Sequence, residues 1–390
     1  MALQQFIVLC DEVKMSDLTK SNRLVSLDAF RGMTIVGMIL VNNPGSWSYV
    51  FPPLLHAPWD GWTPTDFIFP FFLFIMGVAM PFSIGKRLEK GTPKKDLYKK
   101  IISRTLKIFF LGLFLNFYWM FDIESIRIPG VLQRIALCYF FASIIMLNTN
   151  KKWQIGISIF ILILYWALLK LVPVPGFGAG VLVPEGNLCW FIDSHLLAGH
   201  TWTGAPAPGF DPEGLLSTLP AIVTTMLGIF TGDWLRTGKG HMEKVAGIFV
   251  WANIALVVGV VMAIWLPINK NLWTSSYVVF MAGMALHFLG FCYWFIDVKG
   301  IKKWAFPFVV FGMNAIVAYF TLSFIGKTIA YWSFTQGDGT EISVKGWIYQ
   351  NLLQPWAGDY FGSLLFPLFM IFIWFFFLHW LYKKKIFIKI

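Results

Sequence analysis

The sequence predicts an all-α polytopic membrane protein, with about ten transmembrane helices in one bundle. Of its 390 residues, 57% are hydrophobic and only 13% are charged, whereas soluble domains carry about 25% charged residues. The apolar residues also gather in runs that approach the roughly 20 residues a membrane helix needs. The net charge of +11 would suit nucleic acid, but in membrane proteins an excess of Lys and Arg marks cytoplasmic loops. We therefore expect a lipid bilayer and no nucleic-acid partner.

The ten predicted helices follow from the apolar runs in chain order. Proline and glycine inside such runs are tolerated in membrane helices and kink them. The runs are centred near Val36, Phe74, Leu111, Tyr139, Ile161, Val223, Val258, Met281, Ala315 and Ile371.

The distribution of basic residues predicts the orientation. The loops on one side of the predicted membrane, with both termini, hold 22 of the 31 Lys and Arg residues. The opposite loops hold only Arg127, Lys270, Lys327 and Lys345. Because Lys and Arg are enriched in cytoplasmic loops, both termini are expected to be cytoplasmic. The loop that contains His56 then faces the outside.

The chain is expected to form one membrane domain over residues 23–390, preceded by a disordered cytoplasmic tail over residues 1–22. The start lacks the basic region and the apolar length of a signal peptide, and Met15 is a plausible natural start. Cys10, Cys138, Cys189 and Cys292 lack metal-site spacing and are interpreted as packing residues. No metal site is predicted.

Polar residues stand directly before the second apolar run, in the segment HAPWDGWTPTDFIFPFFLFIMG (56–77). Ionisable groups at a membrane face are functional candidates by default. His56 is a candidate general base, because a neighbouring acid such as Asp60 or Asp66 can orient its ring. Trp59 and Trp62 are candidate substrate contacts. The alternative is structural: His56 bonds loop backbone, and Asp66 caps the second helix.

Asn42 ends the first apolar run, near the level of the His56 loop. Its amide can donate to an oxyanion that forms during a reaction, or it can cap the end of the helix. Asp28 and Arg31 share a helix face near the other end of this run. They are expected to pair with each other or with a ligand phosphate.

Several further charges need partners. Arg134, beside Gln133, lies one turn inside the fourth run, and a buried guanidinium needs a carboxylate or a phosphate. Arg104 is expected to extend toward the membrane surface. The long segment 173–213 contains Asp211 and Glu213 but no Lys or Arg, which suits a cationic or sugar-like ligand or simply a loop that translocates easily. No nucleotide-binding, zinc or serine-hydrolase motif is present.

Eight segments in order resemble the heparan-α-glucosaminide N-acetyltransferase family, which comprises lysosomal transmembrane enzymes and bacterial relatives. The segments are RLVSLDAFRG (23–32), HAPWDGWTPTDFIFPFFLFIMG (56–77), RIPGVLQR (127–134), LVPVPGFGAG (171–180), FDPEGLLSTLPAIV (210–223), NKNLWTSSYV (269–278), GMNAIVAYF (312–320) and KKIFIKI (384–390).

This resemblance implies transfer of acetyl from cytoplasmic acetyl-CoA to the amino group of a glucosamine across the membrane. The family's active-site histidine falls on His56 and its asparagine on Asn42, with a slightly longer spacing here. His56 would act as base or carry the acetyl group covalently. Arg134, Gln133, Arg31 and Arg104 are the candidates for holding acetyl-CoA. Because the chain lacks the extended luminal N-terminal region, we expect a bacterial inner-membrane protein with its site facing the periplasm.

Two other functions remain open at this point. Polar residues at broken helices also suit a transporter of amino sugars or oligosaccharides. An O-acetyltransferase of envelope polysaccharide would use the same donor and a hydroxyl acceptor. The acceptor is expected to be an amino sugar or a glycosaminoglycan fragment, and the resemblance is compatible with a homodimer.

Overall fold

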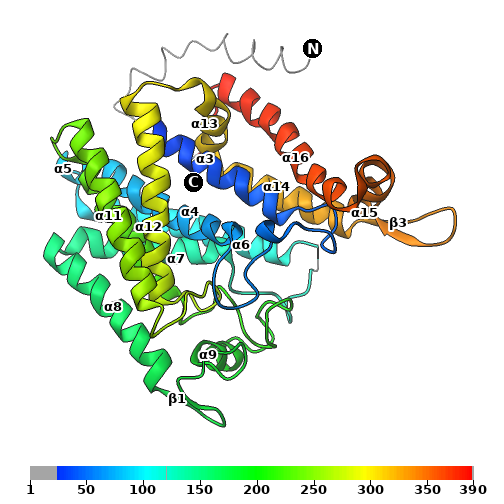
Figure 1. The fold of residues 1–390 in the computed structure, drawn as a ribbon, viewed down its shortest axis with the longest axis horizontal. Helices are drawn as coiled ribbons and strands as arrows, with labels where there is room; N and C mark the ends of the chain where they lie inside the picture. The colour runs from blue at the N-terminus through cyan, green and yellow to red at the C-terminus, as the bar shows by residue number, and fades with distance from the viewer. Residues whose placement is uncertain (1–23, 120, 389–390) are drawn as a thin grey trace.

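The computed structural model describes residues 24–119 and 121–388, which form a helical bundle (Figure 1). Its main helices are α3 (Val25–Asn42), α4 (Ile68–Met80), α6 (Lys94–Phe117), α7 (Val131–Asn148), α8 (Lys151–Leu171), α10 (Thr218–Arg236), α11 (His241–Met262), α12 (Ser275–Cys292), α13 (Phe306–Met313), α14 (Ala315–Tyr331) and α16 (Gln354–Lys383). The short helices are α5 (Lys86–Glu89), α9 (Leu188–Leu196) and α15 (Val344–Trp347). The predicted tail over residues 1–22, with Met15 and Cys10, lies outside the described residues.

Two small antiparallel hairpins are the strands of the described chain. The first pairs β1 (Pro173–Val174) with β2 (Gly178–Ala179), and the second pairs β3 (Ser333–Thr335) with β4 (Glu341–Ser343). The β3–β4 hairpin projects from the bundle, whereas β1 and α9 lie beside the end of α8 (Figure 1). Both hairpins belong to connections between helices.

The all-α prediction is confirmed, and each of the ten predicted centres falls within a helix. Seven helical segments are long and apolar enough to cross a membrane, or eight if the bent pair α13 and α14 is one span. Of the ten predicted transmembrane helices, the two that correspond to α6 and α10 are not among these segments. In α6 the reason is the run of Lys and Arg over residues 94–107, which lowers its hydropathy.

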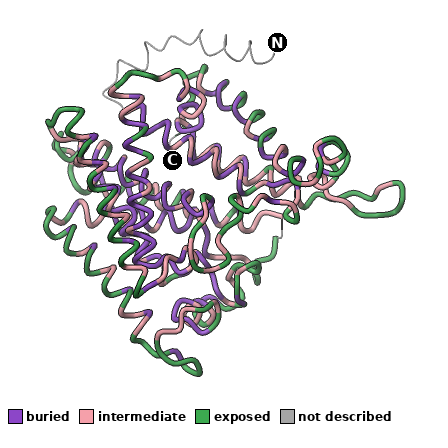
Figure 2. Tube along the Cα trace, in the orientation of Figure 1, coloured by how far each residue is buried: buried purple, intermediate pink, exposed green. Residues whose placement is uncertain are grey.

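The helices differ in how much of their surface the bundle covers. In α8 and α11 only 22% of the apolar window is buried, whereas α3 and the segment that includes α4 are 61% buried. Figure 2 shows this as green tube along α8 and α11 and purple tube through α4. Large apolar side chains such as Ile159, Phe160, Val257 and Trp251 are exposed on those outer helices. Such apolar exposure suits contact with lipid.

Glycines allow the central helices to approach closely. A Cβ added at Gly77 of α4 would lie 2.1 Å from the carbonyl oxygen of Thr225 in α10, and one at Gly228 would lie 2.1 Å from that of Phe74. Gly32 and Gly312 make the same kind of contact between α3 and α13. Small residues that bring backbones together are the usual basis of helix packing in membranes. The His56 loop leads into α4 and so lies at one end of this closely packed helix pair.

Each end of the bundle has its own set of polar contacts. At one end, the Asp297 carboxylate accepts from the backbone N–H groups of Val25 and Ser26. At this end too, Asn314, at the 71° bend between α13 and α14, bonds the backbone of Ile386 and Ile388. His56 and its partners lie at the other end. Which end faces the cytoplasm remains a prediction from the charge distribution.

Candidate active site

The His56 loop connects α3 to α4 and ends in a helix cap. Thr63 and Asp66 form a capping box, in which each side chain accepts from the backbone N–H of the other, and Pro64 occupies the first helical position, where no N–H donor is needed. Asp66 is therefore fixed at the start of a helical segment that continues into α4. The capping role expected as the structural alternative for Asp66 is present.

Asp66 also holds His56, through its other carboxylate oxygen. Its Oδ1 lies 2.6 Å from His56 Nδ1, while Oδ2 accepts from the backbone N–H groups of Ala57 and Thr63. The Asp66 side chain is 1% exposed and that of His56 is 50% exposed. Because a carboxylate only accepts, Nδ1 carries a proton, and in the neutral ring Nε2 therefore holds the lone pair. The pair thus presents a basic ring nitrogen at a partly open surface.

Lys270 is the third member of this group, from the connection between α11 and α12. Its Nζ lies 3.0 Å from Nδ1 and 3.1 Å from Nε2 of His56, and 3.7 Å from Oδ1 of Asp66. Burial lowers the pKa of the Lys270 ammonium, and the charges of Asp66 and Glu213 partly oppose that shift. A cation therefore lies directly beside both nitrogens of the candidate base.

The segment that carries Lys270 is tied to the His56 loop. Asn269 Nδ2 donates to Asp60 Oδ1 at 3.0 Å, and Gly61 N donates to Ile268 O at 2.7 Å. Asn269 also accepts from Leu272 N and donates its own N–H to Thr274 Oγ1, the N-cap of α12. Asp60, predicted as a partner of His56, instead fastens these two segments together.

The two predicted substrate-contact tryptophans pack against protein. Trp59 donates from its indole nitrogen to Leu182 O at 2.8 Å and meets the Phe210 ring edge-on. Trp62 is 43% exposed and lies against Phe67 and Phe280. Trp62 therefore keeps a free ring surface beside the loop, whereas Trp59 joins the loop to segment 172–217.

Asp211 and Glu213, predicted as substrate contacts, both pair with Arg127. Arg127 donates from Nε and Nη2 to the two oxygens of Asp211, at 2.8 and 2.7 Å, and from Nη2 to Glu213. Burial opposes the charged form of Arg127, but the two carboxylates raise its pKa. Arg127 also holds the pKa of Glu213 below its usual value, against the effect of burial. The loop that lacks Lys and Arg thus receives its cation from the connection between α6 and α7.

Arg134 and Gln133 lie at the start of α7, at the same end as His56. The Arg134 side chain is fully buried, donates to Gly214 O and Ser217 Oγ, and lies over the Trp273 ring. Its Nε and Nη1 atoms, and the Nε2 atom of Gln133, are buried without a hydrogen-bond partner among the described residues. Among the described residues Arg134 thus forms no ion pair with a carboxylate, and two of its guanidinium nitrogens stay available to an anionic ligand.

Arg31 and Arg104 lie apart from that pair, each with its own neighbours. Arg31 donates to Asp28 at 3.1 Å, as the helical spacing predicted, and to Gly312 O on α13. Arg104 of α6 stacks on the Tyr139 ring of α7. The four residues predicted to hold acetyl-CoA are therefore spread along the bundle and do not form one cluster.

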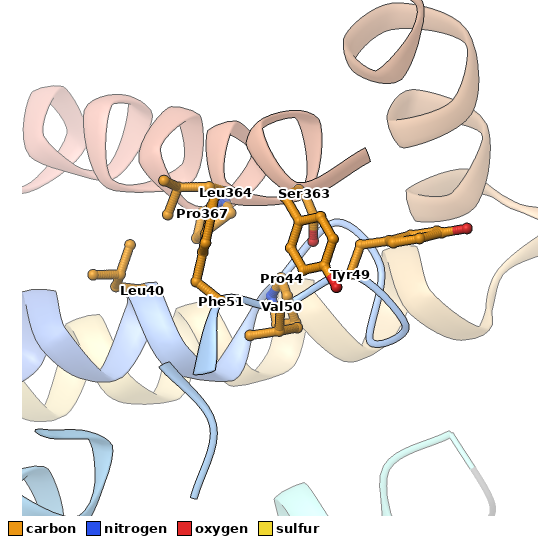
Figure 3. A pocket seen from close by; sticks show the side chains of 9 residues that line it. Leu40, Pro44, Tyr49, Val50, Phe51, Ser363, Leu364 and Pro367 are labelled. Carbon is orange, nitrogen blue, oxygen red and sulfur yellow. The ribbon is translucent and has the colours of Figure 1, made fainter. Parts of the chain in front are cut away.

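Asn42 is the last residue of α3 and is exposed, and the chain turns away after it. The turn rests on α16, where Gly45 N donates to Ser363 O at 2.8 Å and Ser363 Oγ donates to Ser46 O. A mainly apolar recess opens here (Figure 3), lined by Leu40, Pro44, Tyr49, Val50, Phe51, Tyr360, Ser363, Leu364 and Pro367. Neither Asn42 nor His56 lines this recess.

Sequence reasoning missed the roles of Lys270 and Arg127. Both are among the four basic residues of the loops predicted to face outward, and each lies in a segment singled out by resemblance, NKNLWTSSYV or RIPGVLQR. The available signal was their position: a Lys or Arg in loops that otherwise lack positive charge is a candidate for a specific role. Nothing in the local pattern pairs Lys270 with a histidine 214 positions away.

Comparisons with known proteins identify the family of this chain. A model of the catalytic region of heparan-alpha-glucosaminide N-acetyltransferases matches residues 23–266. The Mus musculus heparan-alpha-glucosaminide N-acetyltransferase is 29% identical over 426 residues, which cover 95% of this chain and 61% of that protein. The Homo sapiens protein is 30% identical over 349 residues, which cover 76% and 52%. This chain thus spans roughly half to three fifths of those relatives. It belongs to the heparan-alpha-glucosaminide N-acetyltransferase family.

Proposed function

We propose that this protein is a transmembrane acetyltransferase that moves acetyl from cytoplasmic acetyl-CoA to the amino group of a glucosamine-type sugar on the opposite face. The observation that carries the proposal is the His56–Asp66 pair, 2.6 Å apart and half open to the surface, within the region matched by the family model. An oriented imidazole beside a buried carboxylate is the arrangement that general-base and nucleophilic catalysis both use.

The reaction needs a base and a path for one proton. In direct transfer, the amine nitrogen attacks the thioester carbonyl carbon, a C–N bond forms, and the carbonyl electron pair moves to oxygen. Collapse breaks the C–S bond, and the amine proton passes through His56 Nε2 to the departing sulfur. In the covalent route Nε2 itself attacks the carbonyl carbon, and the C–S bond breaks to release the CoA thiolate. The amine then attacks the acetyl group, the bond from carbon to Nε2 breaks, and the amine proton passes to the freed Nε2. Asp66 holds the ring and its tautomer in either route.

The other binding roles follow from position. Arg134, with two spare buried donors, and Gln133, Arg31 and Arg104 are proposed contacts of acetyl-CoA. The exposed amide of Asn42 and the open ring of Trp62 are proposed contacts of the reacting groups and the sugar. Trp59, Asp60, Asp211 and Glu213 would act by holding the walls of the site, since each already bonds protein.

The orientation is also part of the proposal. The basic residues of the loops favour cytoplasmic termini and an extracytoplasmic His56. We assign the protein to a bacterial cytoplasmic membrane with its site facing the periplasm. Cysteine labelling at Pro58 in a variant without native cysteines should then succeed from outside; labelling only after permeabilisation would reverse the orientation.

The test uses purified full-length protein, acetyl-labelled acetyl-CoA and glucosamine. Wild-type protein should form an N-acetyl product, and His56→Ala should lower kcat by about 10²–10⁴-fold. Lys345→Met is a matched control, because Lys345 packs over Trp47 and Phe366 on the same face. Full transfer by His56→Ala would remove His56 from the mechanism. An ester product would assign an O-acetyltransferase, and no binding of acetyl-CoA would favour a transporter.

A further inference from the structure

Lys270 places a positive charge beside His56 Nε2, the proposed base or nucleophile. Its Nζ is 3.1 Å from His56 Nε2, the nitrogen that keeps the lone pair when Nδ1 donates to Asp66. Any acetyl carbonyl that reaches Nε2, or is attacked next to it, therefore comes within reach of Nζ. Asn42, the expected oxyanion donor, lies instead at the exposed end of α3.

The position of Lys270 is built into the backbone. Asn269 is fixed to Asp60, Ile268 O accepts from Gly61, and Lys270 O accepts from Trp273 N. The Lys270 side chain is 16% exposed, so its ammonium is held with few waters around it. Preorganised charges in such sites stabilise developing negative charge more strongly than charges in bulk water.

We propose that Lys270 is a catalytic residue whose ammonium stabilises the oxyanion that forms on the acetyl carbonyl beside His56 Nε2. This inference rests on the proposed acetyl transfer. Lys270 keeps its three protons throughout: the carbonyl electron pair moves to oxygen, the ammonium donates a hydrogen bond to that oxygen, and the pair returns when the C–S bond breaks.

The charged surroundings of Lys270 set how it should respond to pH. Burial and the charge of Arg134 disfavour its charged form, whereas the carboxylates of Asp66 and Glu213 favour that form. The His56 ring nitrogens also face its Nζ, at 3.0 and 3.1 Å. The sum lowers its pKa, which brings loss of the ammonium closer to the working range. Activity should therefore fall on the alkaline side, where the sugar amine is already neutral and cannot be the cause.

The experiment compares Lys270→Met and Lys270→Arg with wild type, using acetyl-CoA and glucosamine over a pH series. Lys270→Met should lower kcat by about 10²–10³-fold, the usual cost of one oxyanion donor, with KM changed only a few-fold. Lys270→Arg should keep more activity than Lys270→Met and lose the alkaline decline, because a guanidinium stays protonated there. Lys345→Met is again the matched control.

Each outcome decides the question. A kcat for Lys270→Met within threefold of wild type would overturn the inference, as would an unchanged alkaline decline in Lys270→Arg. If Lys270→Met does not fold, the pH profile of Lys270→Arg decides alone. Loss of activity in His56→Ala beside full activity in Lys270→Met would reject the role of Lys270 and leave the proposed function standing. Full activity in His56→Ala would reject the proposed function itself.

Discussion

Two charged groups lie at the same end of the bundle and differ in how complete they are. Arg127 meets Asp211 with two parallel hydrogen bonds and Glu213 with a third contact, and Asp211 is fully buried. In the other group, Asp66 is as deeply buried, but His56 is half exposed and Lys270 lies against the ring. The closed group, formed by Arg127, Asp211 and Glu213, satisfies its charges within the protein. The open group, formed by His56, Asp66 and Lys270, leaves the His56 ring half exposed beside a largely buried ammonium.

The difference distinguishes a structural role from a catalytic one. A closed bidentate ion pair fixes two loops and offers nothing to a ligand. A buried carboxylate that aims an exposed imidazole has the form of an activated base. Residue type alone does not make this distinction, because both groups combine acids and a base in loops of the same face. Each prediction below tests one side of the comparison.

The largest effect is expected from Asp66→Asn, which attacks the open group. The amide offers one acceptor where the carboxylate accepts from His56, Ala57 and Thr63, and its NH₂ favours the wrong tautomer of the ring. We expect kcat/KM for acetyl transfer to fall by about 10²–10⁴-fold. The measurement is steady-state kinetics on variant protein whose thermal unfolding midpoint is checked in detergent.

Asp122→Asn is the control for this change. Asp122 is an exposed acid between α6 and α7 whose hydrogen-bond donors, Glu124 N and Ser125 Oγ, belong to its own loop. Its kinetics should match wild type. An Asp66→Asn protein that folds normally and keeps its rate would leave Asp66 as a helix cap only.

The sequence was sufficient to predict the helices, but it was insufficient to predict the contacts between the loops that connect them. Apolar runs place all ten helix centres, because a membrane demands long apolar helices whatever their partners. Lys270 and Arg127 reach partners 214 and 84 positions away, and no local periodicity encodes such pairs. Asp211 and Glu213 were therefore assigned to a ligand, since Arg127 lies in a different segment. His56 and Asp66 were found because they belong to one short segment.

Arg127→Met tests the closed group and should act on stability. Removing the guanidinium leaves two buried carboxylates without their cation, which typically costs about 3–5 kcal/mol. The expected result is a clear drop in the thermal unfolding midpoint, larger at high pH where both acids are ionised. The triple variant Arg127→Met/Asp211→Asn/Glu213→Gln should recover much of the loss. Wild-type stability with a raised KM for the sugar would instead place Arg127 in substrate binding.

The smallest effect concerns Asp193, which is buried near Asp211 and forms no ion pair among the described residues. Its Oδ1 accepts from Leu215 N at 3.0 Å, its Oδ2 has no hydrogen-bond partner among the described residues, and burial raises its pKa from 3.8 to about 7. A carboxyl with a raised pKa in the folded protein costs nothing while it is protonated in both states. The cost appears as pH rises above the unfolded value and levels off above about 7.

Asp193→Asn removes that titration while it keeps an oxygen for Leu215. Relative to wild type, the variant should therefore gain about 2 kcal/mol in stability between about pH 5 and pH 7.5, read as a growing difference between the two unfolding midpoints. A difference that stays constant with pH would mean that Asp193 is already ionised in the folded protein, stabilised by the nearby charge of Arg134. The closed group would then include Asp193 and Arg134 as well as Arg127. The Trp273 ring, which lies against the Arg134 guanidinium, would separate that larger group from the open group.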